Sequence, residues 1–158
     1  MNTLAFDPGL NGAVAVLDPT GDIIVSFDIP TVGAGKQRRV DAANLADAIR
    51  EHTPYAFAVV EQAAARPGQG VSSTFRFGQA YGTILGILGA LAIPVRHISP
   101  ARWKGALGLN SDGEASRARA IESWPAHAER FRLKQSHHLA EAALLGLYVL
   151  KACTRHPD

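Results

Sequence analysis

The stretch Thr3 to Gly12, TLAFDPGLNG, constrains the fold of this chain more than any other. An apolar run ends in Asp7, and Pro8 and Gly9 then supply the turn chemistry that stops a strand and reverses the chain. The run therefore predicts a buried strand with one carboxylate at its carboxyl end. A carboxylate in this place is most often a turn residue, so its role depends on which other side chains lie beside it.

Two further strands follow at short distances. Ala13 to Leu17 is apolar, and a Pro-Thr-Gly turn leads into a third strand from Ile23 to Ile29. Links this short join antiparallel strands, so the first three strands are expected to form a meander. Residues 30–39 predict a flexible basic loop, either a solvated linker or a contact to phosphates. Its basic residues are Lys36, Arg38 and Arg39.

The rest of the chain alternates helices and strands. We expect a helix over residues 40–52, a strand over 56–60 that ends in Glu61, a long helix over 73–91, a fifth strand over 93–98, and then helices around 102–104, 112–122 and 136–151. A right-handed crossover from the meander places the fourth strand beside and parallel to the first. Asp7 and Glu61 should therefore project from neighbouring strand ends of a five-stranded mixed sheet in an α/β protein.

The long helix carries Gly78, Gly82 and Gly86, which recur every fourth residue and share one face. Because glycine lowers helix stability, a close approach of another segment is expected there. That segment is either the sheet or a second subunit.

The last helix carries a carboxylate in an apolar segment. Almost every residue from Leu139 to Leu150 is Ala, Leu, Gly, Tyr or Val, yet Glu141 lies among them. An unpaired ionised carboxylate is costly in such surroundings, so Glu141 must be protonated, paired with a base or coordinated to a metal. His137 and His138 precede it by four and three residues. We favour His138 as its companion in a metal site and interpret His137 as a cover for the first turn.

Asp7, Glu61, His138 and Glu141 thus predict three acids and an imidazole that converge from two strand ends and one helix. Oxygen-rich clusters bind Mg²⁺ or Mn²⁺, and two such ions ~3.5 to 4 Å apart can activate water and stabilise the leaving oxygen in phosphodiester cleavage. The imidazole modestly favours Mn²⁺. Because the imidazole must be neutral to bind a metal, activity is expected to fall as the pH drops through the pKa of His138.

Composition narrows the class of protein. A length of 158 residues fits a single domain over 1–158, and 47% apolar with 19% charged residues excludes general disorder. The net charge of +2 permits a polyanionic partner without requiring one. A single cysteine, Cys153, excludes an internal disulfide and a cysteine-based zinc site. No secretory leader is visible and no apolar run reaches the ~20 residues of a membrane helix, so we expect a cytoplasmic protein without membrane contact.

The order and spacing of these motifs resemble the RuvC-type Holliday junction resolvases, within the ribonuclease H and retroviral integrase superfamily. The resemblance covers FDPGLNGAVAVL, VVEQ, FGQAYG, the short helix with Trp and Lys, and HHLAEAALLGL. It implies a ribonuclease H-like fold and a homodimeric, metal-dependent endonuclease that nicks branched DNA such as four-way junctions. Asp7, Glu61 and Glu141 match the acidic positions, and His138 matches a position where the ligand type varies. Lys104 resembles the lysine that the family places near the scissile phosphate.

Two departures bear on specificity. The family's aromatic wedge has no counterpart in the segment 63–66, AAAR; Phe75 and Phe77 are candidates for base stacking, although their helical spacing favours the core. A further basic residue of the family lacks a match, and Arg117 is the substitute. The compact chain resembles phage-encoded relatives, which implies a broader range of branched substrates. Besides the basic residues of the 30–39 segment, the candidate DNA contacts are Arg66, Arg76, Arg102 and Arg117.

Three alternatives stay open. The first is a broader ribonuclease H-like nuclease that acts on flaps, forks or other DNA. The second is an ATP-dependent phosphotransferase of the actin and sugar-kinase superfamily, which normally needs two such domains, and the sequence has no phosphate-binding P-loop. The third is a non-catalytic DNA-junction-binding relative, which would be recognised by the loss of an acid.

Overall fold

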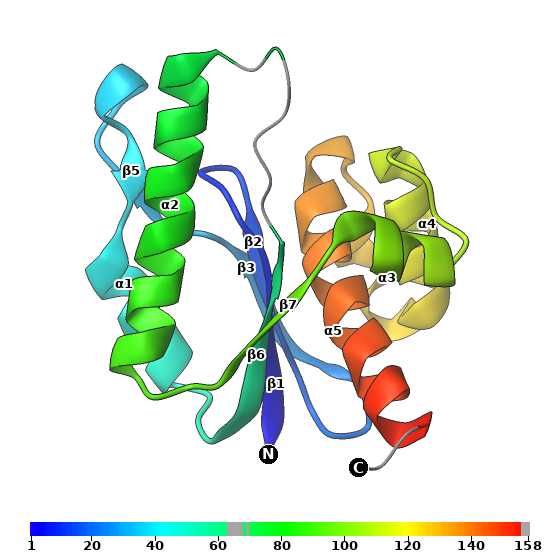
Figure 1. Ribbon diagram of the computed structural model, residues 1–158. Coiled ribbons are helices and arrows are strands. Elements are labelled where there is room, and N and C mark those ends of the chain that lie inside the picture. Colours follow the sequence, from blue (N-terminus) through cyan, green and yellow to red (C-terminus); the bar gives the residue numbers. More distant parts are fainter. Residues whose placement is uncertain (63–67, 69, 156–158) are drawn as a thin grey trace.

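The computed structural model describes residues 1–62, 68 and 70–155, and a five-stranded sheet forms its centre (Figure 1). The strands lie in the order β3-β2-β1-β6-β7. The first three are antiparallel neighbours, whereas β1 with β6 and β6 with β7 pair in parallel. The predicted mixed sheet is confirmed. Its strands are β1 (Asn2–Asp7), β2 (Ala13–Leu17), β3 (Ile23–Asp28), β6 (Tyr55–Glu61) and β7 (Val95–Ile98).

Helices cover both faces of the sheet (Figure 1). One face carries α1 (Ala42–Arg50) and α2 (Val71–Ala90), and the other carries α3 (Pro100–Ala106), α4 (Gly113–Ser123) and α5 (His137–Arg155). Two short 3₁₀ segments, Pro125–Phe131 and Lys134–Ser136, join α4 to α5. None of the helices in the described part of the chain is long and apolar enough to cross a membrane.

The central strand β1 is buried on both faces, and its side chains alternate between two cores. Leu4 and Phe6 pack in the core beneath α1 and α2, whereas Ala5 belongs to the core beneath α5. Successive residues of a strand point to opposite faces, so Asp7 projects on the α5 side. The same alternation in β6 places Glu61 on that side. The two carboxylates thus share one face of the sheet as well as one edge.

The last helix lies unusually close to this face. A Cβ added to Gly146 of α5 would lie 2.7 Å from Leu17 Cδ1 and 3.1 Å from Ala5 Cβ. Only glycine permits this approach without displacing the sheet. The close contact fixes the height of α5 above β1 and β2, and with it the position of Glu141 one and a half turns earlier in the helix.

The basic segment 30–39 is ordered, contrary to the predicted flexible loop. Two short strands, β4 (Thr31–Val32) and β5 (Arg39–Val40), pair antiparallel and enclose a 3₁₀ turn, Gly35–Gln37. The prediction failed because strands of two residues leave no periodic pattern in a sequence.

The glycine face of α2 is exposed, which rules out the sheet as its partner. Gly78, Gly82 and Gly86 are all exposed, and a Cβ at any of them would have no atom within 4 Å among the described residues. Val71 and Phe75, at 87% and 71% exposure, extend the same face toward the start of the helix. The expectation that Phe75 packs in the core is therefore wrong.

Candidate active site

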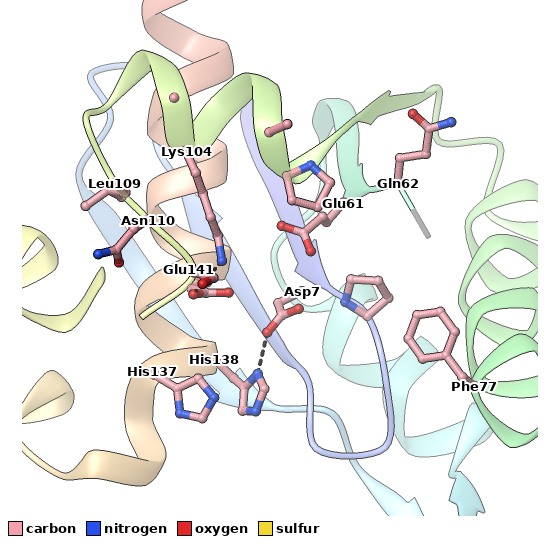
Figure 2. Close-up of a pocket in the computed structure, with 15 residues that line it drawn as sticks. Asp7, Glu61, Gln62, Phe77, Lys104, Leu109, Asn110, His137, His138 and Glu141 are labelled. Carbon is pink, nitrogen blue, oxygen red and sulfur yellow. Dashed lines mark hydrogen bonds and ion pairs between the residues drawn. The ribbon is translucent and has the colours of Figure 1, made fainter. Parts of the chain in front are cut away.

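A cavity of about 720 Å³ opens where β1 and β6 end beside the first turns of α5. The ionisable side chains point toward its centre from both strands, from α3 and from α5 (Figure 2). All five residues that the sequence predicted as catalytic or metal-binding line it. They are Asp7, Glu61, Lys104, His138 and Glu141.

Asp7 is held by a sharp turn behind it and a histidine in front. A Cβ at Gly12 would lie 2.1 Å from the carbonyl oxygen of Asp7, so the turn after β1 requires glycine there. On the cavity side, Nδ1 of His138 donates to Oδ2 of Asp7 at 2.5 Å. Asp7 is 9% exposed. The first strand and the last helix therefore meet directly at this carboxylate.

Glu61 receives a bond from α3. Nε1 of Trp103 donates to Oε2 of Glu61 at 2.8 Å, and Trp103 is fully buried. A buried indole N–H needs an acceptor, and a carboxylate is a strong one.

Glu141 is paired, which is one of the three states that its apolar surroundings allow. Nζ of Lys104 lies 2.8 Å from Oε1 of Glu141, and Oγ of Ser116 donates to the same oxygen at 3.0 Å. The side chains of Lys104 and Glu141 are 15% and 10% exposed. Since Ser116 is fully buried in α4, this acid joins α3, α4 and α5.

The charge balance of the cavity shifts several pKa values. Burial is the main cause that raises the pKa of Asp7 and of Glu61, because desolvation penalises their charged forms. The hydrogen bond to Asp7 raises the pKa of His138, because it stabilises the imidazolium. Negative charge in this cavity is therefore only partly compensated by the protein.

The two histidines differ in their contacts. His138 reaches Asp7, whereas Nδ1 of His137 donates to the carbonyl oxygen of Lys134 at 3.1 Å. Their ring centroids are 3.8 Å apart. His137 also lines the cavity, but its bond and its contact with His138 give it the role of a support for that ring.

The donor set suits a hard divalent cation. The described residues contain no group of three His, Cys, Asp and Glu side chains already arranged to hold a metal ion. Each acid, however, uses one oxygen in the bonds above, and the described side chains form no hydrogen bond to the other oxygen. Carboxylate oxygens and a neutral imidazole are ligands for Mg²⁺ and Mn²⁺, and a bound cation would stabilise the charged forms of the acids that burial disfavours.

Among the described residues, the predicted DNA contacts lie outside the cavity. Lys36, Arg39 and Arg102 are exposed, and Arg76 is half-buried on α2. Arg66 falls outside the described residues. The two remaining residues, Arg38 and Arg117, have their guanidinium groups engaged within the protein.

Arg38 connects the hairpin formed by β4 and β5 to the turn that follows Asp7. It donates to Thr31 Oγ1 at 3.1 Å, Asn11 Oδ1 at 2.7 Å and the Leu10 carbonyl at 2.7 Å.

Arg117 joins α4 to the segment before α5. It donates to the carbonyl oxygens of Phe131 at 2.8 Å and Arg132 at 2.6 Å, and to Glu114 Oε2 at 2.8 Å. Both arginines therefore stabilise the surroundings of the cavity.

Sequence reasoning missed two residues of the site. Trp103 was noted only as part of a motif, and Ser116 lies in a helix that reads as polar and exposed. The only available signal was a tryptophan directly before the predicted catalytic lysine. A buried acceptor for its indole could have been sought among the predicted acids.

The raised pKa of Glu61 predicts a gain in stability when its charge is removed. Because the folded state holds the proton more tightly than the unfolded state, folding stability falls as pH rises from the ordinary value of 4.5 through the folded pKa. Glu61→Gln should therefore raise the Tm of the EDTA-treated protein by a few degrees at pH 7.5. The gain should vanish near pH 4, where both states of the wild type are protonated.

Differential scanning calorimetry from pH 4 to 8 measures this effect. Glu51→Gln, at an exposed position at the end of α1, is the matched control and should leave the Tm unchanged. A Tm of Glu61→Gln at or below the wild-type value at pH 7.5 would contradict the assigned burial penalty.

Comparisons with known proteins support the architecture. No protein-family model matches the chain, and no curated protein matches it by sequence. The structure titled T. thermophilus RuvC in complex with Holliday junction substrate matches with a TM-score of 0.66 and 18% identity, over 98% of this chain and 96% of that chain. A second Thermus thermophilus RuvC structure matches with a TM-score of 0.59 and 17% identity, over 98% of this chain and 97% of that chain. The chain therefore has the ribonuclease H-like fold of the RuvC Holliday junction resolvases.

Proposed function

We propose that this chain is a metal-dependent endonuclease that nicks branched DNA, four-way junctions among them, by hydrolysis of a phosphodiester. One observation carries the proposal: three carboxylates, an imidazole and an ammonium group line a single cavity at the edge of the sheet. The likeness to a RuvC solved with a Holliday junction supports DNA as the substrate class.

Asp7, Glu61, His138 and Glu141 are the residues that would hold the divalent cations. A bound cation supplies Lewis-acid stabilisation of developing charge and a water molecule of lowered pKa. Trp103 places a donor on one oxygen of Glu61, and Ser116 and Lys104 place donors on one oxygen of Glu141, so each acid is held in place by the protein with its other oxygen left for a cation.

Lys104 supplies fixed positive charge at the same place. Its ammonium group lies at Glu141 and lines the cavity, where a phosphate oxygen can share it. An ammonium in a partly dehydrated cavity stabilises charge that develops on the phosphate far better than one in water.

Exposed basic side chains outside the cavity support contact with a larger polyanion. Lys36 and Arg39 on the hairpin and Arg102 on α3 are free to reach phosphates, since all three are exposed. Phe75 presents most of its ring to solvent at the start of α2, two residues before Phe77, which lines the cavity. We assign Phe75 to stacking on an unpaired base.

The exposed glycine face of α2 supports a homodimer. Small residues let two helix backbones approach closely, and the stripe formed by Gly78, Gly82 and Gly86 includes no charged residue. We propose that two copies of this face cross each other. A dimer would present two cavities to one branched DNA, as paired nicks require.

Cleavage assays test the main proposal. A labelled four-way junction, a flap, a fork and a linear duplex are incubated with Mg²⁺, Mn²⁺ or EDTA. We expect metal-dependent nicking of the branched substrates, reduced roughly 10³-fold or more by Glu61→Gln or Glu141→Gln, because several kcal/mol of charge stabilisation is lost. Junction binding in EDTA should be retained by both variants, and Glu51→Gln should cleave as the wild type does.

Two outcomes of these assays discriminate the alternatives. Binding of junctions without cleavage under either metal would leave a non-catalytic DNA-binding protein. Equal cleavage of linear duplex would retain a nuclease of the broader class and remove the junction selectivity.

The pH profile tests His138 as a ligand. The bond to Asp7 raises its pKa above 6.5, so protons compete with the cation at a higher pH than for a free histidine. At limiting Mn²⁺, the cleavage rate should rise as pH increases through this raised pKa. His138→Asn should flatten that limb of the profile. A wild-type rate that is constant from pH 7.5 down to pH 5 would exclude His138 from the ligand set.

Light scattering tests the dimer. The wild type should have a dimeric mass, and Gly82→Leu should be monomeric because the added side chain prevents close approach of the helices. Ser73→Leu is the matched control and should remain dimeric. Ser73 is exposed on α2 nine residues before Gly82, which is two and a half helical turns and places it on the opposite side of the helix. A monomeric wild type would contradict the proposed assembly.

A further inference from the structure

We infer that Trp103 is a positioning residue, whose indole N–H fixes the Glu61 carboxylate in the orientation that cation binding needs. The inference rests on the proposed function. Trp103 does not line the cavity, so it acts through Glu61 and not on the substrate.

The bond between the two residues is well suited to this task. The N–H and the carboxylate oxygen are 2.8 Å apart, and the tryptophan is fully buried. An indole nitrogen can only donate, so the bond has one possible direction. Because no water can replace the acceptor inside the core, rotation of Glu61 away from Trp103 would leave a buried donor without a partner.

Glu61 needs such a support because it is the last residue of its strand. The backbone of β6 is paired with β7 up to this residue. The side chain has three rotatable bonds and lies at a half-exposed sheet edge. Holding one oxygen against Trp103 leaves the other directed into the cavity (Figure 2).

The position of Trp103 in α3 links this acid to the next one. Lys104, the adjacent residue, pairs with Glu141 of α5. Successive residues of one seven-residue helix therefore hold acids from two separate elements, β6 and α5. The indole is anchored in the core beneath α5, so α3 sets the distance between Glu61 and Glu141 before a cation binds.

The second tryptophan of the chain provides a matched control. Trp124 is also buried, at 5% exposure, and its Nε1 donates to the Gly21 carbonyl at 2.9 Å. Its substitution by phenylalanine removes the same ring atoms and the same kind of bond. This hydrogen bond involves none of the proposed metal ligands. Trp124→Phe therefore reports the general cost of losing a buried indole.

Isothermal titration of Mn²⁺ into the wild type, Trp103→Phe and Trp124→Phe tests the inference. We expect Kd for Mn²⁺ to rise about 10-fold or more in Trp103→Phe, the range found when a partner of a metal ligand is removed. Trp124→Phe should keep the wild-type Kd. In a Glu61→Ala background, Trp103→Phe should cause no additional loss, because the ligand through which it acts is absent.

The outcomes separate this inference from the proposed function. A wild type that binds no Mn²⁺ and cleaves no branched DNA would overturn both. A wild type that does both, with an unchanged Kd in Trp103→Phe or an equal rise in the two tryptophan variants, would overturn the positioning role alone.

A measurement on the unmodified side chains covers the case in which Trp103→Phe does not fold. In wild-type protein with ¹⁵N-labelled indoles, Mg²⁺ should shift the N–H resonance of Trp103 and leave that of Trp124 in place. Trp124→Phe assigns the two signals. A Trp103 resonance that does not move while Mg²⁺ binds would overturn the inference.

Discussion

Keeping three carboxylates in one partly dehydrated cavity is the constraint on which the arrangement of this molecule depends. Burial disfavours the charge of Asp7 and Glu61, and each acid is accordingly met by a donor from a different part of the chain. His138 reaches the first acid, Trp103 the second, and Lys104 with Ser116 the third. The helices α3, α4 and α5 are thus located against the sheet by the chemistry of the site as well as by apolar packing. Sites of this kind lower stability in exchange for reactivity.

The two faces of the sheet have separate roles. The α5 face carries the site, and its helices converge on the ends of β1 and β6 (Figure 1). The α2 face builds a second apolar core and leaves a long helix surface open to solvent. Because alternate residues of one central strand serve both faces, a register shift of one residue in β1 would exchange the acid for its apolar neighbour Phe6.

Much of this could be predicted from local patterns. The apolar run that ends in Asp7, the crossover to a strand that ends in Glu61 and the apolar helix around Glu141 gave the sheet order and the set of cavity acids. Handedness and strand period determine these features, and both act over short stretches of sequence. The apolar surroundings of Glu141 also showed that it needs a partner, although three kinds of partner remained open.

The rest depends on contacts between distant residues. Nothing local distinguishes Arg38, which ties the hairpin to the first turn, from Arg39 beside it, which is exposed. Ser116 reads as a surface residue of a polar helix until α5 covers it. Phe75 has the spacing of a core residue, but the described part of the chain places no apolar surface opposite it. Such positions are decided by which segments meet, and that information is absent from any single segment.

The sequence separation within the site has a consequence for how the protein is made. Asp7 and its partner His138 are 131 residues apart, and the first and last major elements pack directly on each other. A nascent chain can pair the early strands well before α5 leaves the ribosome, since folding proceeds from the amino end during synthesis. Until then the site lacks the imidazole of His138 and the carboxylate of Glu141. The order of synthesis itself therefore leaves the cavity without its full set of ionisable side chains until the last helix has been made.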